Sequence, residues 1–231
     1  MDERQSYRHE LKYVVSSAQA VLLRQRLAGL MRPDPHAGRD GSYTVRSLYL
    51  DDWDGRCFYE NEAGVDPREK YRVRIYNHSP DRILLERKRK ERQLTRKAGC
   101  PLTPAQARQI AEGGVLSPGP DQPALLRLLA ADVRRRRLRP AVIVEYDRIP
   151  FVHRAGNVRV TLDMNVSSSA CFDGFFNEII PRRPVLPEGR HILEVKFDGF
   201  LPDFLYRSLQ LDDMQRTAYS KFYYCRKFQL R

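Results

Sequence analysis

The residues of this sequence best suited to chemistry are lysines and arginines that recur at every second position. In the segment KYRVRIY, Lys70, Arg72 and Arg74 alternate with apolar residues. Side chains of a strand alternate between its two faces, so these three cations share one face. Arginine donates paired hydrogen bonds to phosphate oxygens, and lysine supplies a compact positive charge. The pattern therefore predicts a face that binds a phosphate-rich anion such as a triphosphate.

Carboxylates accompany the cations at the same spacing. An E-x-K pattern occurs three times, and other strands carry similar rows: Glu10/Lys12, Glu86/Lys88/Lys90, Glu194/Lys196, Tyr146/Arg148 and Arg159/Asp163. Carboxylates repel phosphate, so their expected role is to hold Mg²⁺ or Mn²⁺, which prefer oxygen ligands and bridge phosphates. We expect Glu194 to be the main metal ligand, followed by Glu10, Glu86 and Asp163.

Alternating segments predict the strands that position these side chains. They are Tyr7–Val14, Tyr43–Asp51, Lys70–Tyr76, Ile83–Lys90, Ala141–Ile149, Val158–Asn165 and His191–Phe197, with Phe172–Ile179 as a weaker eighth. Capping residues predict helices over Ala18–Leu30, after Ser16 or Ser17, and over Ala105–Ala111, after Thr103 and Pro104. Two further helices are expected at Pro123–Val133 and Asp203–Leu211.

The charged rows bear on the fold class. A solvated sheet face with cross-strand ion pairs would explain any one such strand. If helices cover the apolar faces, however, the charged faces share an interior, where charges are costly unless paired or bound to a ligand. We therefore predict a single α+β domain over residues 1–231. It would be a closed antiparallel β-barrel of about eight strands, with helices packed outside and a polyanion and a metal cation inside.

Composition is consistent with this interpretation. The 231 residues carry a formal net charge of +12, which favours an anionic partner without choosing its class. Basic residues that alternate with apolar ones disfavour a nucleic-acid surface. The four cysteines form no C-x-x-C pair, and neither a signal peptide nor a membrane-spanning apolar run is visible, so a cytoplasmic protein is expected. The run Arg134–Arg137 is expected to be a solvated helix end; guidance of polyphosphate or contact with acidic lipid are alternatives.

Eight motifs in order resemble one known family. They are RHELKY (Arg8–Tyr13), SLYLD (Ser47–Asp51), KYRVRIY (Lys70–Tyr76), LLERKRK (Leu84–Lys90), EYDR (Glu145–Arg148), RVTLD (Arg159–Asp163), LEVK (Leu193–Lys196) and YSKF (Tyr219–Phe222). Each is weak alone, but together they resemble the VTC domain, the polyphosphate polymerase domain of the vacuolar transporter chaperone complex. That family belongs to the triphosphate tunnel metalloenzymes.

The resemblance implies a function and a set of site residues. It implies transfer of the terminal phosphate of ATP to a growing polyphosphate chain, with a divalent metal, preferably manganese. The implied catalytic phosphate contacts are Lys12, Arg72, Arg74, Lys88, Arg148, Arg159 and Lys221. Tyr146 and Ser220 would hydrogen-bond phosphate oxygens, Lys97, Lys90 and Lys196 would add basic contacts, and Glu194 would hold the metal.

Departures from the family pattern keep alternatives open. Arg8 replaces the first Glu of the superfamily's E-x-E-x-K, which favours the polymerase-like branch. Ala218 stands where the eukaryotic catalytic chain has a further lysine. The chain resembles a stand-alone, bacterial-type member, for which a membrane-protein partner at the inner membrane face is an expectation from the eukaryotic complex. A triphosphatase, releasing orthophosphate, and a non-catalytic polyphosphate-binding subunit are the alternatives to the polymerase.

Overall fold

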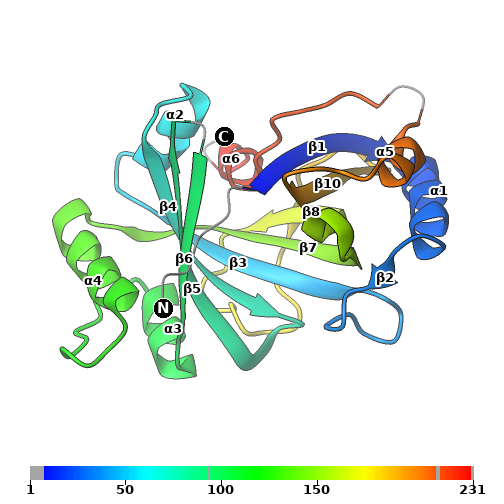
Figure 1. Ribbon diagram of the computed structural model, residues 1–231. Coiled ribbons are helices and arrows are strands. Elements are labelled where there is room, and N and C mark those ends of the chain that lie inside the picture. Colours follow the sequence, from blue (N-terminus) through cyan, green and yellow to red (C-terminus); the bar gives the residue numbers. More distant parts are fainter. Residues whose placement is uncertain (1–7, 93, 212–213, 230–231) are drawn as a thin grey trace. The chain divides into compact units, whose positions relative to one another are not determined.

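A computed structural model describes residues 8–92, 94–211 and 214–229 of the chain. The strands within these residues are β1 (Arg8–Ser16), β2 (Arg32–Pro33), β3 (Tyr43–Asp51), β4 (Arg68–Tyr76), β5 (Ser79–Glu91), β6 (Leu94–Pro101), β7 (Arg139–His153), β8 (Val158–Ser169), β9 (Arg183–Pro184) and β10 (Arg190–Asp198). The α-helices are α1 (Ser17–Ala28), α2 (Arg56–Glu62), α3 (Pro104–Ala111), α4 (Ala124–Arg136), α5 (Asp203–Leu209) and α6 (Lys221–Lys227), and a short 3₁₀ turn, η1, spans Ala155–Asn157 (Figure 1).

The predicted closed barrel is wrong. The ten described strands form one sheet in the order β1-β10-β8-β7-β3-β4-β5-β6, with β2 beside β7 and β9 beside β8. The order has two ends, because β1 and β6 are not partners among the described residues. An alternating pattern reports only that a strand has two unlike faces. It cannot show whether the two edge strands of a sheet meet, because closure depends on curvature accumulated over all the strands.

The chain divides into two compact units, which are described separately. Unit 1 comprises Met1–Thr44, Tyr146–Val166 and Leu186–Tyr219, and unit 2 comprises Val45–Glu145, Ser167–Val185 and Ser220–Arg231. The expectation of a single domain stays a prediction. No helix of the described residues is long and apolar enough to cross a membrane.

Helices α1 and α5 supply the core of unit 1. Ser16 caps α1 by accepting a hydrogen bond from the amide of Gln19, whose side chain in turn accepts from the Ser16 amide, so the helix begins where the sequence predicts. Leu23 and Leu27 of α1 and Leu205 of α5 are fully buried with Val160 and Val195 of the sheet. The apolar face of these strands is therefore the one that packs against helices.

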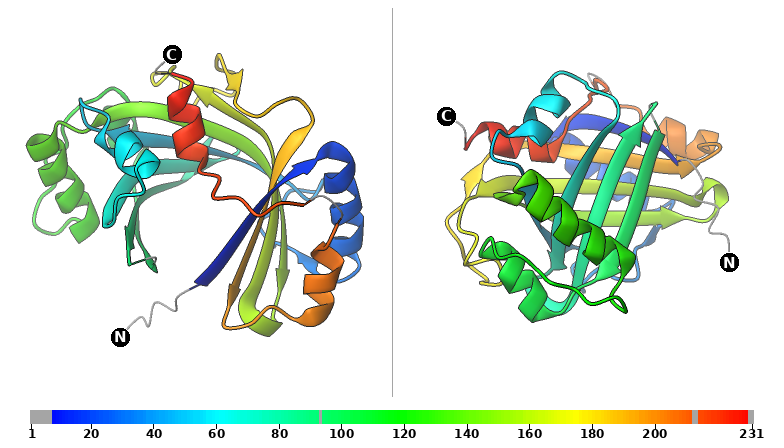
Figure 2. Two further views of the ribbon diagram at one scale, coloured as in Figure 1. Left: turned by 90° about the horizontal axis from the view of Figure 1, so that it is seen from above. Right: turned by 90° about the vertical axis from the view of Figure 1, so that its left-hand side faces the viewer.

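Helices α3 and α4 do the same in unit 2. Thr103 caps α3 in the same reciprocal manner, with Pro104 in its first turn. Ile110 of α3 and Leu129 of α4 belong to one core cluster with Leu48, Val73 and Leu85 of the sheet. Figure 2 shows both helices over strands β4 to β6. In each unit the helices pack against the apolar face of the strands and leave the charged rows on the opposite face.

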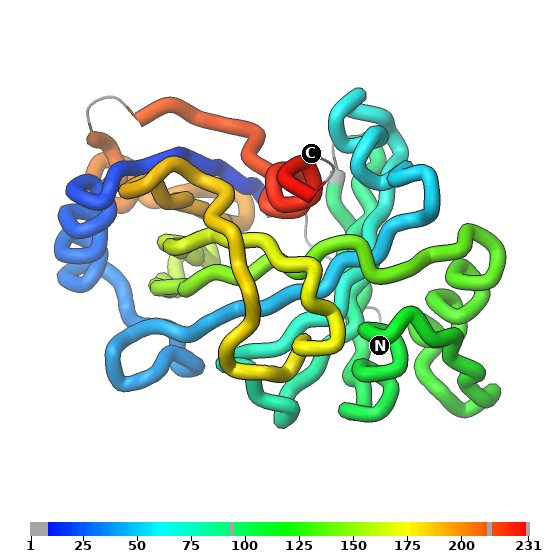
Figure 3. The backbone as a smooth tube through the Cα atoms, turned by 180° about the vertical axis from the view of Figure 1, so that it is seen from behind, coloured from blue at the N-terminus to red at the C-terminus, as the bar shows by residue number. Residues whose placement is uncertain are grey.

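The elements mostly agree with the sequence prediction. All seven predicted strands and all four predicted helices are present, although Tyr7, where the first strand was expected to begin, lies outside the described residues. The weaker eighth strand is absent from the described residues: Phe172–Ile179 lies in a loop that Figure 3 shows in yellow. Its carbonyls bind Arg46 instead of a neighbouring strand, with Nη1 at 3.0 Å from Phe175 O and 2.5 Å from Asn177 O.

Candidate functional site

In unit 1 the charged rows of three strands meet on one face of the sheet, with opposite charges paired between β1 and β10. Lys12 of β1 lies opposite Glu194 of β10, and Glu10 lies opposite Lys196, which in turn lies opposite Arg159 of β8. Residues directly opposite in a sheet point to the same face. The predicted E-x-K patterns therefore form one cross-strand network.

Glu194 is the centre of that network. It is 5% exposed. Its carboxylate lies 2.9 Å from Lys196 Nζ, 3.7 Å from Lys12 Nζ and 3.6 Å from Arg148 Nη2. Lys12 also lies 2.8 Å from Glu10 and donates to the carbonyl of Tyr219 at 3.2 Å. Because Glu10 pairs with Lys12 and Asp163 pairs with Arg148, the three cations around Glu194 are balanced by three carboxylates, and the network holds these side chains in place.

Arg148 and Asp163 form a buried pair in the same unit. Arg148 Nε and Nη2 donate to the two carboxylate oxygens of Asp163 at 2.6 and 2.8 Å, and Asp163 is fully buried. Burial alone would lower the pKa of Arg148, but the adjacent Asp163 charge raises that pKa well above its ordinary value. The guanidinium also lies 5.1 Å from the ring centre of Tyr146, so Tyr146 packs beside it.

Arg159 is anchored by residues that the sequence analysis did not select. Its Nη2 lies 2.8 Å from Asp34 Oδ2 and donates to the hydroxyl of Tyr43 at 2.8 Å. Asp34 follows the two-residue strand β2, where the sequence has no alternating pattern that would indicate a partner on β8. Only the fold reveals this contact.

In unit 2 a second carboxylate holds the predicted arginine pair. Glu86 of β5 lies 2.6 Å from Arg72 Nε and 3.7 Å from Arg74 Nε, and it also pairs with Lys97 of β6. Burial would raise the pKa of Glu86, but Arg72, Arg74 and Lys97 together lower it to about 2. Glu86 is therefore ionised at neutral pH and orients these cations.

Tyr49 and Ser47 of β3 complete this arrangement. Arg72 Nη1 donates to the hydroxyl of Tyr49 at 2.8 Å, and Arg74 Nε donates to Ser47 Oγ at 3.2 Å. Both partners lie in the SLYLD motif, at the alternate positions that share a face with the arginines. The two-residue period of that motif could have identified them.

Three lysines stand in a row beside the arginines. Lys70 of β4 lies opposite Lys88 of β5, which lies opposite Lys97 of β6. Like charges directly opposite one another destabilise a sheet, so this row favours an anion over it. Lys90 lies two residues along β5, opposite Arg68 and Thr95.

Lys70 was not among the predicted site residues, although it lies in the same alternating row. Its Nζ donates to Asn61 Oδ1 at 2.6 Å and lies 4.3 Å from the ring centre of Phe222. Burial lowers the pKa of Lys70 to about 7. The side chain of Lys70 therefore changes between its charged and neutral forms near neutral pH.

Ser220 and Lys221 lie at the start of α6, a helix that the sequence did not predict. Ser220 Oγ accepts from the amide of Tyr223 at 3.4 Å and caps this seven-residue helix. Lys221 is its first residue and is half-buried. Their roles in binding phosphate stay predictions.

The predicted metal ligands do not form a cluster. Among the described residues no group of three or more His, Cys, Asp or Glu side chains could hold a metal ion. Asp163 is bound at both oxygens by Arg148, and both oxygens of Glu86 are in close contact with a cation, Oε2 with Arg72 and Oε1 with Lys97, whereas Lys12 and Arg148 lie 3.7 and 3.6 Å from Glu194. Mg²⁺ is commonly held by one or two carboxylates together with substrate phosphates. Glu194 fits that type of site best, because a second carboxylate, Glu10, lies nearby: Lys12 pairs with both of them.

In a comparison with solved structures, this chain is similar in fold to several proteins at low sequence identity. A suggested adenylate cyclase from Bacillus halodurans is similar, with a TM-score of 0.50 and 14% identity over 89% of this chain and 87% of that one. The PH1819 protein of Pyrococcus horikoshii OT3 has a TM-score of 0.48 and 13% identity, over 97% of this chain and all of that one. The PH1012 protein of the same organism has a TM-score of 0.45 and 12% identity, over 90% and 94%.

A search of curated proteins found no match. The VTC domain, by contrast, matches residues 7–229, nearly the whole chain, and this span contains every predicted site residue. The resemblance drawn from the eight motifs is thereby confirmed. The chain belongs to the VTC domain family.

Proposed function

We propose that this chain is a metal-dependent phosphotransferase that lengthens polyphosphate with the terminal phosphate of ATP. The observation that carries the proposal is the charged face of strands β4 to β6 in unit 2. Six cations stand there with Glu86 as their counter-ion: Lys70, Arg72, Arg74, Lys88, Lys90 and Lys97. Such an excess of positive charge on one sheet face suits a chain of phosphates better than a single carboxylate ligand.

The reaction requires no covalent intermediate with the protein. A terminal oxygen of the polyphosphate chain attacks the γ-phosphorus of ATP, the bond from that phosphorus to the β-phosphate oxygen breaks, and ADP leaves. Catalysis then depends on position and charge neutralisation. In this proposal Arg72, Arg74 and Lys88 bind phosphate oxygens in unit 2, and Lys12, Arg148 and Arg159 bind them in unit 1.

A divalent cation, Mn²⁺ or Mg²⁺, is part of the proposal. Glu194 would bind it, because Lys12 and Arg148 lie 3.7 and 3.6 Å from its carboxylate, beyond hydrogen-bond distance, and Arg148 is held by Asp163. When bound, the cation would neutralise charge on the transferred phosphoryl group. Lys12 and Lys196 would orient the carboxylate from either side.

A product assay tests the proposal. The protein is incubated with ATP and Mn²⁺, and polyphosphate is resolved on a stained gel while orthophosphate is measured in parallel. We expect a polyphosphate ladder that Arg72→Ala/Arg74→Ala abolishes and that Arg82→Ala/Arg127→Ala, two exposed arginines of the same unit, leaves intact. Orthophosphate without chains would instead indicate a triphosphatase. Binding of polyphosphate without either product would indicate an accessory subunit.

A further inference from the structure

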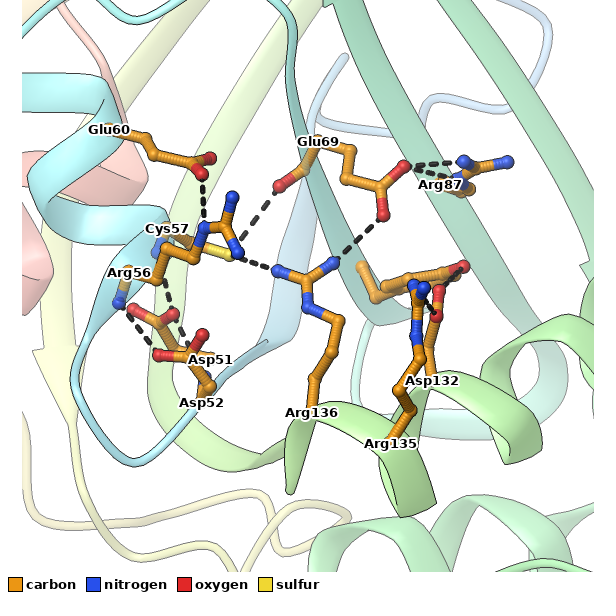
Figure 4. Close-up of polar contacts among 11 residues, drawn as sticks. Asp51, Asp52, Arg56, Cys57, Glu60, Glu69, Arg87, Asp132, Arg135 and Arg136 are labelled. Atoms are coloured by element: carbon orange, nitrogen blue, oxygen red, sulfur yellow. Dashed lines mark hydrogen bonds and ion pairs between the residues drawn. The ribbon is translucent and has the colours of Figure 1, made fainter.

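A second arginine-rich site lies in unit 2, away from the charged face. A hollow of about 490 Å³ is lined by five arginines, two glutamates and a proline: Arg56, Arg68, Arg89, Arg135, Arg136, Glu60, Glu69 and Pro67. These residues come from α2, the start of β4, the end of β5 and the end of α4. Figure 4 shows Arg56 beside Glu60 on α2 and Arg136 of α4 directed at Glu69.

Two strand residues of the hollow, Glu69 and Arg89, lie on the opposite face of the sheet from the lysine row, whereas Arg68, at the start of β4, has the register of that row. Glu69 lies opposite Arg89, and both alternate with Lys70 and Lys88 along their strands. They therefore share the face of Tyr71 and Val73, which packs against the core. A ligand in this hollow would be separate from one on the charged face.

The hollow carries more positive charge than its own carboxylates neutralise. Glu60 pairs with Arg56 at 2.6 Å. Glu69 is shared by Arg136, at 2.9 Å, and by Arg87 of the neighbouring strand, whose Nε donates at 2.9 Å. Arg136 Nε is buried without a hydrogen-bond partner among the described residues. A guanidinium has five N–H donors, so an arginine that pairs with a carboxylate can also bind a second anion.

A solvated helix end does not account for the arrangement. Cations in the last turn of α4 are favourable at a helix C-terminus, which explains Arg135 and Arg136. It does not explain why Arg56, Arg68 and Arg89 from three other segments line the same hollow. Carboxylates compensate four of the five lining arginines: Glu60 pairs with Arg56, Glu91 with Arg89, Asp132 with Arg135 and Glu69 with Arg136. Arg68, together with Arg87, which shares Glu69, leaves a surplus of positive charge that an anion would compensate.

We propose that this hollow binds a small anion that carries several phosphoryl groups. Planar guanidinium forks match phosphate oxygens, and both glutamates are already committed to arginines, so they do not oppose the ligand strongly. The volume is that of a typical small-molecule site. The inference does not rest on the proposed activity, because it needs only a phosphate-binding surface.

Binding of tripolyphosphate tests the site. The measurement is made by calorimetry in the Arg72→Ala/Arg74→Ala protein, so that binding at the charged face is weakened. Adding Arg56→Ala/Arg89→Ala removes two arginines whose own side chains are 65% and 42% exposed, so folding is expected to survive; circular dichroism checks it. Arg135 is left in place because it pairs with the buried Asp132.

We expect at least a tenfold loss of the remaining tripolyphosphate affinity with Arg56→Ala/Arg89→Ala, and less than a twofold change with the control Arg82→Ala/Arg127→Ala. Equal losses in both pairs would mean a general charge effect and would overturn the proposal. Unchanged affinity with Arg56→Ala/Arg89→Ala, or binding of anionic lipid vesicles or DNA in place of tripolyphosphate, would overturn it as well. A protein that makes no polyphosphate but gives the expected binding result would refute only the proposed function.

Discussion

Arg148 holds Asp163 through two hydrogen bonds, from Nε at 2.6 Å and from Nη2 at 2.8 Å, while the same Nη2 lies 3.6 Å from Glu194. The two carboxylates thus stand in different relations to one arginine. Both carboxylate oxygens of Asp163 accept hydrogen bonds from Arg148 and so fix its guanidinium. Glu194 lies beyond hydrogen-bond distance of the same guanidinium. This geometry separates a positioning carboxylate from a candidate metal ligand.

Asp163→Asn should destabilise the fold without changing the metal requirement. Removing one partner of a buried pair leaves an uncompensated charge and costs about 3–5 kcal/mol. Urea unfolding measures the loss, and Asp121→Asn, at an exposed position, should change stability by less than about 0.5 kcal/mol. The concentration of Mn²⁺ that gives half-maximal activity should stay within twofold of the wild-type value; a tenfold increase would make Asp163 a metal ligand instead.

Glu86→Gln should reduce the dependence of the free energy of unfolding on pH in the acidic range. The pKa of Glu86 is lowered from its ordinary value near 4.5 to about 2, so its contribution is complete above pH 4.5 and is lost as the pH falls toward 2. Glutamine does not titrate, so the variant is less stable at pH 7, by about 3 kcal/mol, and loses less on acidification. The free energy of unfolding is measured from pH 2 to 7, with Glu91→Gln, on the same strand, as control. Parallel curves for the wild type and Glu86→Gln below pH 4.5 would contradict the assignment.

Lys70→Met should remove a pH dependence on the alkaline side. The pKa of Lys70 is lowered to about 7, so between about pH 7 and its ordinary value near 10.5 the unfolded chain binds one more proton than the folded chain. Stability from this group therefore rises with pH across that window. The variant should show a flatter curve there, while Lys90→Met should retain the wild-type slope.

Tripolyphosphate affinity reports on the same proton. A bound anion favours the charged form of Lys70, so binding should take up a proton above pH 7 and weaken as the pH rises. Calorimetry in two buffers of different ionisation enthalpy measures that uptake, and Lys70→Met should abolish it. Identical uptake in the wild type and the variant would assign the proton to another group.

Much of the fold could be predicted because its signals are local. The capping residues Ser16 and Thr103 lie at the observed helix starts, and the alternating segments lie within observed strands. Helix α2 was missed because its capping carboxylates, Asp51 and Asp52, lie before the N-cap position, which is a glycine. Gly55 precedes it without a side-chain bond, and the buried carboxylate of Asp51, at the end of β3, instead accepts from the amides of Cys57 and Phe58.

The site could be predicted in part for a similar reason. The two-residue period correctly grouped residues on one face, and the sheet register then placed Lys12 against Glu194 and Arg72 against Glu86. It could not show that Arg159 binds Asp34, or that Arg148 engages both oxygens of Asp163, because those contacts depend on tertiary packing. The prediction that the sheet closes into a barrel was wrong for the same reason, because closure also depends on tertiary structure.

The most direct test of the account follows the γ-phosphate of ATP. Protein is given ATP labelled at that phosphate, Mn²⁺ and a short polyphosphate primer, and the label is separated into chains, orthophosphate and remaining ATP. We predict that the wild type transfers label into chains and that Glu194→Gln reduces the rate about 100-fold or more while its tripolyphosphate affinity stays within a few-fold. Label that appears only in orthophosphate, or transfer that Glu194→Gln leaves unchanged, would contradict the account.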